Sequence, residues 1–418
     1  MKKTLFLLFI FPFLIFSFQV SSQEAKFSGE AGSVWAAALR SENRGDFVLG
    51  DTYLNAKIDA FYEKSSAYAE GRAGFDEVAD ETYYDLCEIW LDYTTDFWGL
   101  RLGRQKAAWG KADGIDITNV LCPRDYSTTR ALFNDEHKAI DAARFSLNKG
   151  SFLLDTYFIP FFTSSPLPKE KIAQLSSINK PEKNIKSAEY GIKLSGYFSK
   201  CDLSLYGFYG FEDTPFLNYE PKIQNGTQAG IEVTASYKKM TMLGVDAAIP
   251  LGETVLRLEA AFFPNRYFQK SGNTIIREKM ISFANGTSAE IENTLQRNEI
   301  SALAGLDWMR ETWTFTAQYY CDFIFGGLDT LERTKNYNHG ASLSISKSLL
   351  AETLKLSASG ILHLNDLDSA VELSAEYALS DSIFLETGSY IFNEGKNPGT
   401  YGAYKNLTSA YVKCRFCF

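Results

Sequence analysis

Hydrophobic and polar residues alternate along most of this chain, which is the pattern of β-strands with one apolar face and one polar face. In the stretch TWTFTAQYYCDF, one face carries Trp313, Phe315, Ala317, Tyr319, Cys321 and Phe323. The same period of two runs through EYGIKLSGYF (189–198) and SAVELSAEYAL (369–379). Apolar residues at helical spacing are scarce, so the pattern predicts an all-β protein.

The lengths of the strands and connections indicate a membrane barrel. The expected strands are about 10–14 residues long, against about 5–6 in soluble proteins, and about 9–11 residues cross a bilayer at a tilt. Short connections lie at 64–66, 96–97, 148–150, 199–201, 251–253, 310–311, 348–351 and 379–381. They alternate with longer ones at 42–51, 78–82, 110–137, 162–186, 212–236, 265–296, 326–337, 364–367 and 393–404. Tight turns at one end and longer loops at the other are typical of outer-membrane barrels.

We therefore predict a transmembrane antiparallel up-and-down β-barrel of about 18 strands, within roughly 16–20. The range is open because residues 227–250 could hold an extra pair of strands. Lipid offers no hydrogen-bond partner to the backbone, so only a closed barrel lets strands span a membrane. An apolar outer face and a polar lumen then agree with a hydrophobic content of only 45%.

The two ends of the chain agree with export to an outer membrane. Residues 1–22 begin with Lys2 and Lys3 and continue with an apolar run, as in a secretory signal peptide. That run is shorter than the roughly 20 residues of a spanning helix. We therefore expect residues 23–418 to form a single barrel. The last strand, SAYVKCRFCF, carries Phe416 and Phe418 on its apolar face and resembles the assembly signal of bacterial outer-membrane proteins.

The stretch RLGRQKAAWGKADGIDITNVLCPRD (101–125) predicts a strand that leads into a long loop. Alternation points Arg104 at lipid, so we predict a β-bulge at Gly103 that returns Arg104 to the lumen. No Gly-Lys-Ser/Thr follows, which excludes a phosphate-binding loop. The DGID segment lacks the later ligands of a calcium loop.

This stretch resembles an uncharacterised porin-like outer-membrane family with a domain of unknown function. The shared residues are Gly103, Arg104, Gln105, Trp109, Gly110, Asn119, Pro123 and Asp125. The resemblance implies an outer-membrane barrel without a settled substrate. By analogy with porin constriction loops, it also implies that residues 110–137 fold into the lumen.

The predicted constriction combines charged and aromatic residues of this loop with charges of the wall. The expected pore-lining residues are Arg101, Gln105, Trp109, Asp113, Asp116, Arg124, Arg130, Arg144, Arg257 and Glu259. Two arrangements stay open for the charges on the lumen face. They form either opposed rows that orient a passing solute or salt bridges that line a wet interior.

Catalytic and metal chemistry find little support in the sequence. The chain has only three histidines, and none is paired at metal-binding spacing. A Ser-His-Asp site would need His363 beside a wall serine. The six cysteines are spread over walls, turns and a loop, which favours small hydrophobic residues over a disulfide framework. We expect no enzymatic activity, cofactor or metal.

The sequence therefore predicts a channel for passive or facilitated diffusion of small polar solutes. The alternatives are a channel for hydrophobic molecules and a surface adhesin or structural barrel that acts through loops 162–186 and 265–296. The expected location is the outer membrane of a diderm bacterium, with periplasmic termini and extracellular long loops. Expected partners are lipid, the barrel-assembly machinery and the solutes, but no nucleic acid, and the oligomeric state stays open between monomer and trimer.

Overall fold

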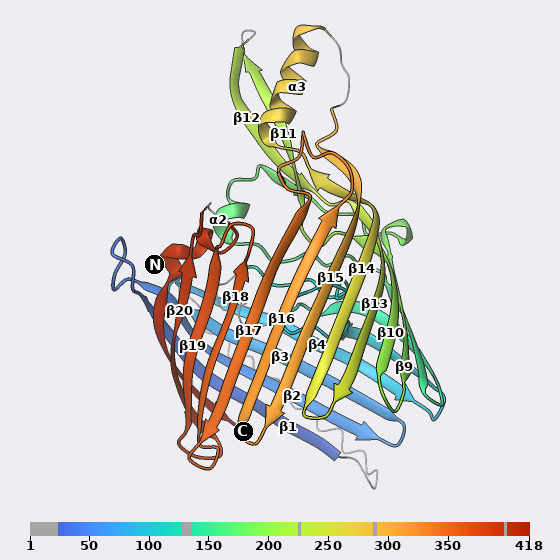
Figure 1. Ribbon diagram of the computed structural model, residues 1–418, viewed down its shortest axis with the longest axis vertical. Coiled ribbons are helices and arrows are strands. Elements are labelled where there is room, and N and C mark those ends of the chain that lie inside the picture. Colours follow the sequence, from blue (N-terminus) through green and yellow to red (C-terminus); the bar gives the residue numbers. More distant parts are fainter. Residues whose placement is uncertain (1–23, 128–135, 225–226, 287–290, 397–398) are drawn as a thin grey trace, which may run out of the picture.

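The chain forms a closed β-barrel with a small outgrowth of helix and sheet at one end (Figure 1). The structure is a computed structural model, and it describes residues 24–127, 136–224, 227–286, 291–396 and 399–418. The predicted signal peptide, residues 1–22, lies outside the described residues and stays a prediction. Among the described residues, no helix combines the length and apolarity needed to cross a membrane.

The wall is an 18-stranded sheet in which each strand pairs antiparallel with the next. Its strands are β1 (Glu24–Ala38), β2 (Phe47–Tyr62), β3 (Ser65–Asp76), β4 (Glu81–Thr94), β5 (Trp98–Gln105), β6 (Ile140–Lys149), β7 (Phe152–Ile159), β9 (Glu189–Tyr197), β10 (Asp202–Phe211), β13 (Lys239–Leu251), β14 (Thr254–Gln269), β15 (Thr294–Arg310), β16 (Trp313–Ile324), β17 (Tyr337–Leu349), β18 (Leu354–His363), β19 (Ser369–Ala378), β20 (Ile383–Asn393) and β21 (Ser409–Cys417). The barrel closes where β1 pairs with β21, from Glu30↔Cys417 to Ala38↔Ser409. The predicted fold class and strand number are confirmed.

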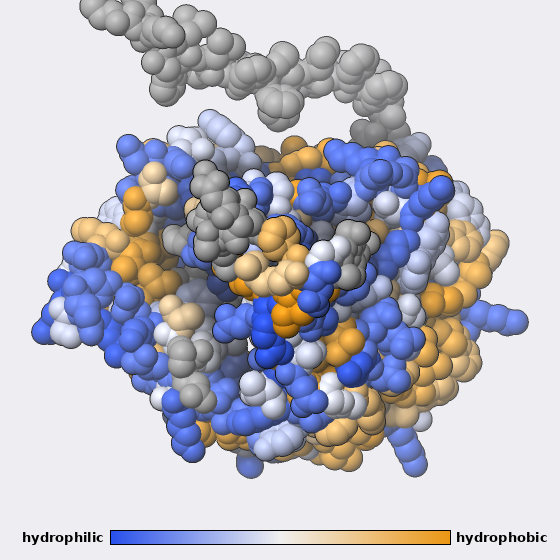
Figure 2. All heavy atoms as spheres, turned by 90° about the horizontal axis from the view of Figure 1, so that it is seen from above, coloured by the Kyte–Doolittle hydropathy of each residue, from blue (hydrophilic) through white to orange (hydrophobic). Residues whose placement is uncertain are grey.

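The two faces of the wall differ as the alternation predicts. On β21, Val412 is 54% exposed on the outside, whereas its neighbour Tyr411 is 2% exposed on the inside. Seen from above, hydrophobic residues gather around the outer circumference and hydrophilic residues cover much of the mouth (Figure 2). An apolar belt outside and a polar interior are what lipid on one side and water on the other require.

The long and short connections lie at opposite ends of the barrel, as their alternation predicts. The C-terminus lies at the end of the short turns, opposite the outgrowth (Figure 1). There Phe418 exchanges two backbone hydrogen bonds with Gly29, of 2.8 and 3.0 Å, and its ring lies 5.5 Å from that of Phe27. The last residue is therefore part of the seam that closes the barrel.

The outgrowth is built from three of the long connections. The connection between β10 and β13 forms a hairpin of β11 (Phe216–Gln224) and β12 (Thr227–Ser236), and β8 (Ser177–Asn179) pairs parallel to β12. Residues 227–250 therefore supply one outgrowth strand and one wall strand, and they add no pair to the barrel. Short helices occupy the same connections: α2 (Lys169–Ile172), η1 (Ile185–Ser187) and α3 (Gly272–Ala284), while η2 (Gly402–Leu407) precedes β21.

The predicted bulge at Gly103 is wrong. The pairing of β5 with β4 and β6 runs through Gly103 without a shift, and Gly103 takes a φ of +129°. Arg104 therefore lies on the same face as its partner Ile89, which is 49% exposed. Its charge is balanced by Asp141, its partner on β6, through two hydrogen bonds of 3.0 Å each. A register shift does occur one pair of strands earlier, between Glu70 and Gly71 on β3.

Candidate functional site

The connection between β5 and β6 folds into the barrel over residues 106–127 and reaches the far wall. Going round the wall from β5, the strands β6, β7, β9, β10, β13, β14 and β15 come before β16. Gln318 on β16 nevertheless holds the backbone of Asp113 at both ends, at 3.0 Å from the amide nitrogen and 2.7 Å from the carbonyl oxygen. In a barrel of 18 strands, a segment that joins β5 to β16 crosses the lumen.

The strongest attachment of this loop is the buried carboxylate of Glu259 on β14. Its Oε1 accepts hydrogen bonds from the backbone amides of Lys111 and Ala112, and its Oε2 accepts one of 3.2 Å from the hydroxyl of Thr118. Glu259 is 4% exposed and Thr118 is fully buried. Gly110 allows this approach, because a Cβ there would lie 2.9 Å from Oε1 and the residue has a φ of +84°.

Other wall residues hold the same segment along its length. The hydroxyl of Tyr206 on β10 accepts from the amide of Gly110 at 3.2 Å, and Lys193 on β9 donates to the carbonyl of Ala108 at 3.2 Å. Arg257 on β14 donates to the carbonyl of Lys111 at 2.6 Å and pairs with Asp307 on β15. Arg257 and Glu259 are both among the predicted pore-lining residues, and in the structure both are engaged with the loop backbone.

The part of the loop next to the wall is apolar and forms a core inside the barrel. Buried loop residues pack with wall residues in one cluster that includes Ala107, Trp109, Ile117, Leu121 and Cys122. Trp109 is 5% exposed, and its ring lies 5.0 Å from that of Tyr206 and 6.0 Å from that of Tyr157. Burial raises the pKa of the Cys122 thiol to about 11. All six cysteines lie among the described residues, and each is a free thiol.

The predicted loop charges gather around Asp116. Its carboxylate lies 3.2 Å from Arg124 and 3.1 Å from Nε2 of His137, and it accepts a 3.0 Å hydrogen bond from Asn119. Burial opposes ionisation of Asp116, but the contacts with His137, Arg124 and Asn119 outweigh it and lower the pKa of this carboxyl. Arg130 lies outside the described residues. Within the described ranges, no group of His, Cys, Asp and Glu has the arrangement of a metal site.

The expected charges of the wall are paired with one another. Arg101 on β5 lies 2.8 Å from Asp92 on β4, and its guanidinium lies 3.6 Å from the ring centroid of Trp90. Arg144 on β6 lies 3.4 Å from the same carboxylate. Gln105 is 1% exposed and donates to the carbonyl of Ala142 on β6 at 2.9 Å. These contacts favour the salt-bridged interior over opposed rows of free charge.

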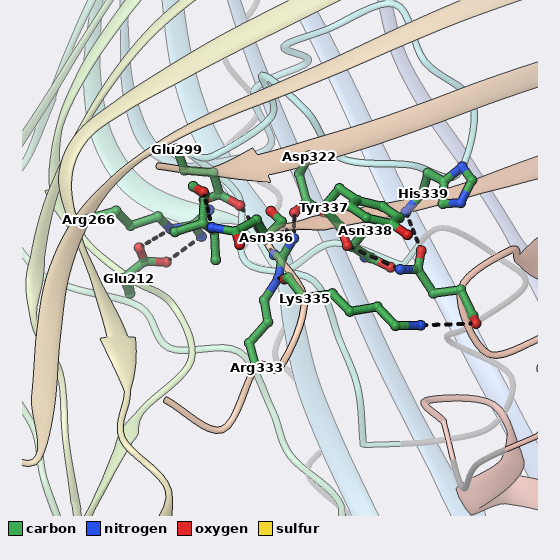
Figure 3. Close-up of polar contacts among 12 residues, drawn as sticks. Glu212, Arg266, Glu299, Asp322, Arg333, Lys335, Asn336, Tyr337, Asn338 and His339 are labelled. Carbon is green, nitrogen blue, oxygen red and sulfur yellow. Dashed lines mark hydrogen bonds and ion pairs between the residues drawn. The ribbon is translucent and has the colours of Figure 1, made fainter. Parts of the chain in front are cut away.

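A second network fixes the rim of the barrel near β14–β17 (Figure 3). Arg266 on β14 binds Glu212 through two hydrogen bonds of 2.6 and 2.9 Å and donates a third, of 2.6 Å, to Glu299 on β15. Arg333, in the connection between β16 and β17, pairs with Asp322 on β16 and lies 3.8 Å from Glu299. Two-point contacts of guanidinium with carboxylate have defined geometry, so the network ties this connection to the wall.

The crossing loop leaves a cavity on each side. One, of about 590 Å³, lies against β2–β4 and is lined by paired charges such as Arg72 with Asp51 and Lys138 with Asp85. Burial disfavours the charge of Lys138, but Asp85 and Asp125 outweigh it and raise the pKa of this amine. The other, of about 530 Å³, lies against β16–β18 and is lined mainly by uncharged polar and aromatic side chains.

Several residues that build this site could not be singled out from the sequence. Tyr206, Gln318 and Thr118 are polar residues with no distinctive spacing, and Asp92 differs from other lumen acids only through its two arginine partners. Alternation placed the wall residues on the inner face. It gave no signal for which of them meets the loop.

A comparison with protein families matches residues 126–353 to DUF1302, described as a protein of unknown function. The chain belongs to the DUF1302 family. The match covers the wall from before β6 to the turn before β18, which includes the strands that anchor the loop. The porin-like family of unknown function suggested by the Gly-Arg-Gln and Trp-Gly segment is thus confirmed. None of the curated proteins compared with the chain matches it.

Solved structures match the whole barrel at low sequence identity. Acinetobacter baumannii OccAB3 has a TM-score of 0.53 and 10% identity, with 96% of this chain and all of that chain covered. Pseudomonas aeruginosa OccK2 (OpdF) has a TM-score of 0.52 and 9% identity over 95% of this chain and 97% of its own. Pseudomonas aeruginosa OccK8 (OprE) has a TM-score of 0.50 and 8% identity over 95% and 98%. At these identities the likeness shows the fold.

Proposed function

We propose that this protein is a porin-like outer-membrane channel for passive or facilitated diffusion of small polar solutes. The observation that carries the proposal is the loop segment of residues 106–127, which crosses the lumen and is held to β14 and β16 by Glu259 and Gln318. A loop fixed across the lumen blocks part of its cross-section. Any path through the barrel must then pass through the cavities on either side of the loop. The structural likeness to OccK2, which has been solved in complex with glucuronate, supports a polar solute.

The proposal includes a location and an orientation. Closed barrels with an apolar outer belt span outer membranes, where the short turns face the periplasm and the long loops face outward. The termini of the barrel would then be periplasmic, and the outgrowth of β8, β11, β12 and α3 would be extracellular. A concentration gradient drives the solute, and no enzymatic step is part of the proposal.

Conductance in planar bilayers tests this function. Shortening residues 113–130 should raise the single-channel conductance, because the segment that crosses the lumen would be lost. Arg101→Ala should move ion preference toward cations, because Arg144 would be the one arginine still paired with Asp92 among the described residues. If conductance and selectivity both keep their wild-type values in the shortened protein, the loop lies outside the conducting path. A wild-type protein that conducts no ions would refute the channel itself.

One observation favours a second function, which is binding at the surface. Three long connections join in one outgrowth: those that contain residues 162–186, 212–236 and 265–296. Their strands β8, β11 and β12 form one sheet, and Lys279 of α3 pairs with Glu220 of β11. Deleting this outgrowth should leave conductance unchanged if it serves only in surface binding. The paired charges and hydroxyl groups among the linings of the two cavities argue against the third expectation, a channel for hydrophobic molecules.

A further inference from the structure

We propose that the cavity between the crossing loop and β16–β18 is a binding site for a neutral polyhydroxylated solute, such as a short saccharide. The inference rests on the proposed function and names the solute class for one side of the lumen. The volume of this cavity, about 530 Å³, lies within the range of about 300–1,000 Å³ found for small-molecule sites. The kind of ligand follows from the chemistry of its lining.

The wall of the cavity is a surface of hydroxyl and amide groups. Thr316 on β16 is in register with Ser344 on β17, which is in register with Ser359 on β18. In the adjoining row, Gln318 is in register with Ser342. Neighbouring strands lie about 4.7–4.9 Å apart, so these groups form a grid of polar side chains. Thr316 donates to Asp307, and Gln318 is bound to Asp113 and Ser342. Ser344 and Ser359 are therefore the hydroxyls that can donate to and accept from a ligand.

Tyrosine rings form the other part of the lining. Tyr126 comes from the crossing loop, Tyr320 from β16, Tyr404 from η2 and Tyr401 from the position just before η2. The hydroxyl of Tyr320 is buried and has no hydrogen-bond partner among the described residues, although the side chain is only 8% exposed. Because this hydroxyl has almost no accessible surface, Tyr320 meets the cavity with its ring and not with its hydroxyl. The flat apolar faces of the rings suit the C–H faces of a sugar.

The charges of the lining exclude a preference for anions. Arg124 supplies the lining's single Lys or Arg side chain within the described part of the chain, and it is engaged with Asp116 and with the carbonyl of Gly114 at 2.9 Å. The side chain of Asp113 adds an exposed carboxylate to the same lining. The cavity against β2–β4 differs, because Arg72 and Lys138 bring cations to it. An acidic sugar would therefore be repelled where a neutral one is hydrogen-bonded.

Binding and transport tests separate this inference from the channel function. The mature protein would be purified in lauryldimethylamine oxide, which carries no sugar headgroup, and titrated with maltose, with glucuronate and with a short polyethylene glycol of similar size. We expect saturable binding of maltose and much weaker binding of the other two. In planar bilayers, maltose should reduce the ion current over the same concentration range.

Variants locate the binding. The double substitution Ser344→Ala with Ser359→Ala should weaken maltose binding about five- to tenfold. Ser374→Ala, on the inner face of β19 but outside the lining, is the matched control and should leave it unchanged. Tyr320→Phe, which removes only an enclosed hydroxyl without a partner, should keep or raise thermal stability and leave maltose binding unchanged.

The outcomes separate the two proposals. Normal ion conduction without saturable maltose binding, or equal binding of maltose and glucuronate, would overturn the inference and leave the channel function standing. Saturable maltose binding that the double variant abolishes, in a protein that conducts no ions, would support the site and refute the channel.

Discussion

Removing the carboxylate of Glu259 should release the crossing loop from the wall. In the substitution Glu259→Ala, the amides of Lys111 and Ala112 and the hydroxyl of Thr118 lose their shared acceptor. The remaining attachments are those of Tyr206, Lys193, Arg257 and Gln318, and the last of these binds at a separate point. Undocking of the segment around residue 111 therefore becomes easier, while the strands of the wall keep all their ladder hydrogen bonds.

The size of the effect follows from three hydrogen bonds to a buried charged group. Such bonds contribute about 1.5–3 kcal/mol each, and part of this sum is offset because the cost of burying the carboxylate disappears as well. We therefore expect Glu259→Ala to reduce the free energy that favours the docked loop by about 2–4 kcal/mol. At about 1.4 kcal/mol for each factor of ten, the undocked population should rise about 30- to 1,000-fold.

Two measurements report this population. Hydrogen exchange of the peptide that contains residues 106–118 should accelerate by the same factor, because exchange follows the opening equilibrium. Single-channel recordings should show a higher mean conductance and more frequent transitions between levels. Glu259→Gln is the matched control, since its amide oxygen can still accept from one or both backbone amides, and it should lie between the wild type and Glu259→Ala.

The expected changes are specific to the loop. If Glu259→Ala exchanges and conducts like the wild type, the carboxylate does not hold the loop and the reasoning is refuted. If exchange accelerates throughout the barrel, the substitution has destabilised the wall, and the loop effect is not isolated. Arg310→Lys, at a charge paired with Glu253 beside a short turn and outside both cavity linings, should change neither readout and tests for a general response to altered ion pairs.

Three further predictions concern the seam, the orientation and the response to acid. Deleting Phe418, or Phe418→Ser, should lower the yield of heat-modifiable protein in the membrane, because the residue is part of the β1–β21 seam; an unchanged yield would argue against a role in assembly. A tag inserted after Asn179 should bind antibody on intact cells, whereas a tag at the turn Lys149-Gly150 should not; the opposite pattern would invert the topology. The pKa of Asp116 is lowered in the folded protein, so its stabilising contacts are present above its ordinary pKa of 3.8 and are lost only as the pH falls through the lower folded value. Titration of Asp116 should therefore cause no change in conductance between pH 5 and 8. Recordings of current noise against pH check this expectation, and the noise should rise only in stronger acid.

The barrel could be predicted because the features that indicate it lie within single strands and the connections between them. Alternation fixes the face of each residue, and connection lengths fix which strands are neighbours, so β1 to β21 follow in order. The helix α3 was missed, although Ser271 caps its first turn through the amide of Thr274 and Gly286 follows its end with a φ of +65°. Its apolar residues span too few turns to stand out from the strands on either side.

Contacts across the lumen could not be predicted, because they join strands that are far apart around the wall. Alternation correctly turned Arg257 and Glu259 inward, but the same reasoning applied to every acid and base on the inner faces. What distinguishes Glu259 is the path of residues 110–118, and that path depends on the φ of Gly110 and on the packing of Trp109 against Tyr157 and Tyr206.

The crossing loop also decides which charges in the lumen remain available to a solute. Wall arginines such as Arg101 and Arg144 share a carboxylate with each other, whereas Arg257 is turned to the loop backbone and to Asp307. The loop itself brings Asp113 to the side of β16–β18, where the wall offers hydroxyls and no cation of its own within the cavity lining that the structure describes. A substitution that moves the loop therefore changes the width and the charge of the lumen together, so conductance and selectivity should shift in the same variants.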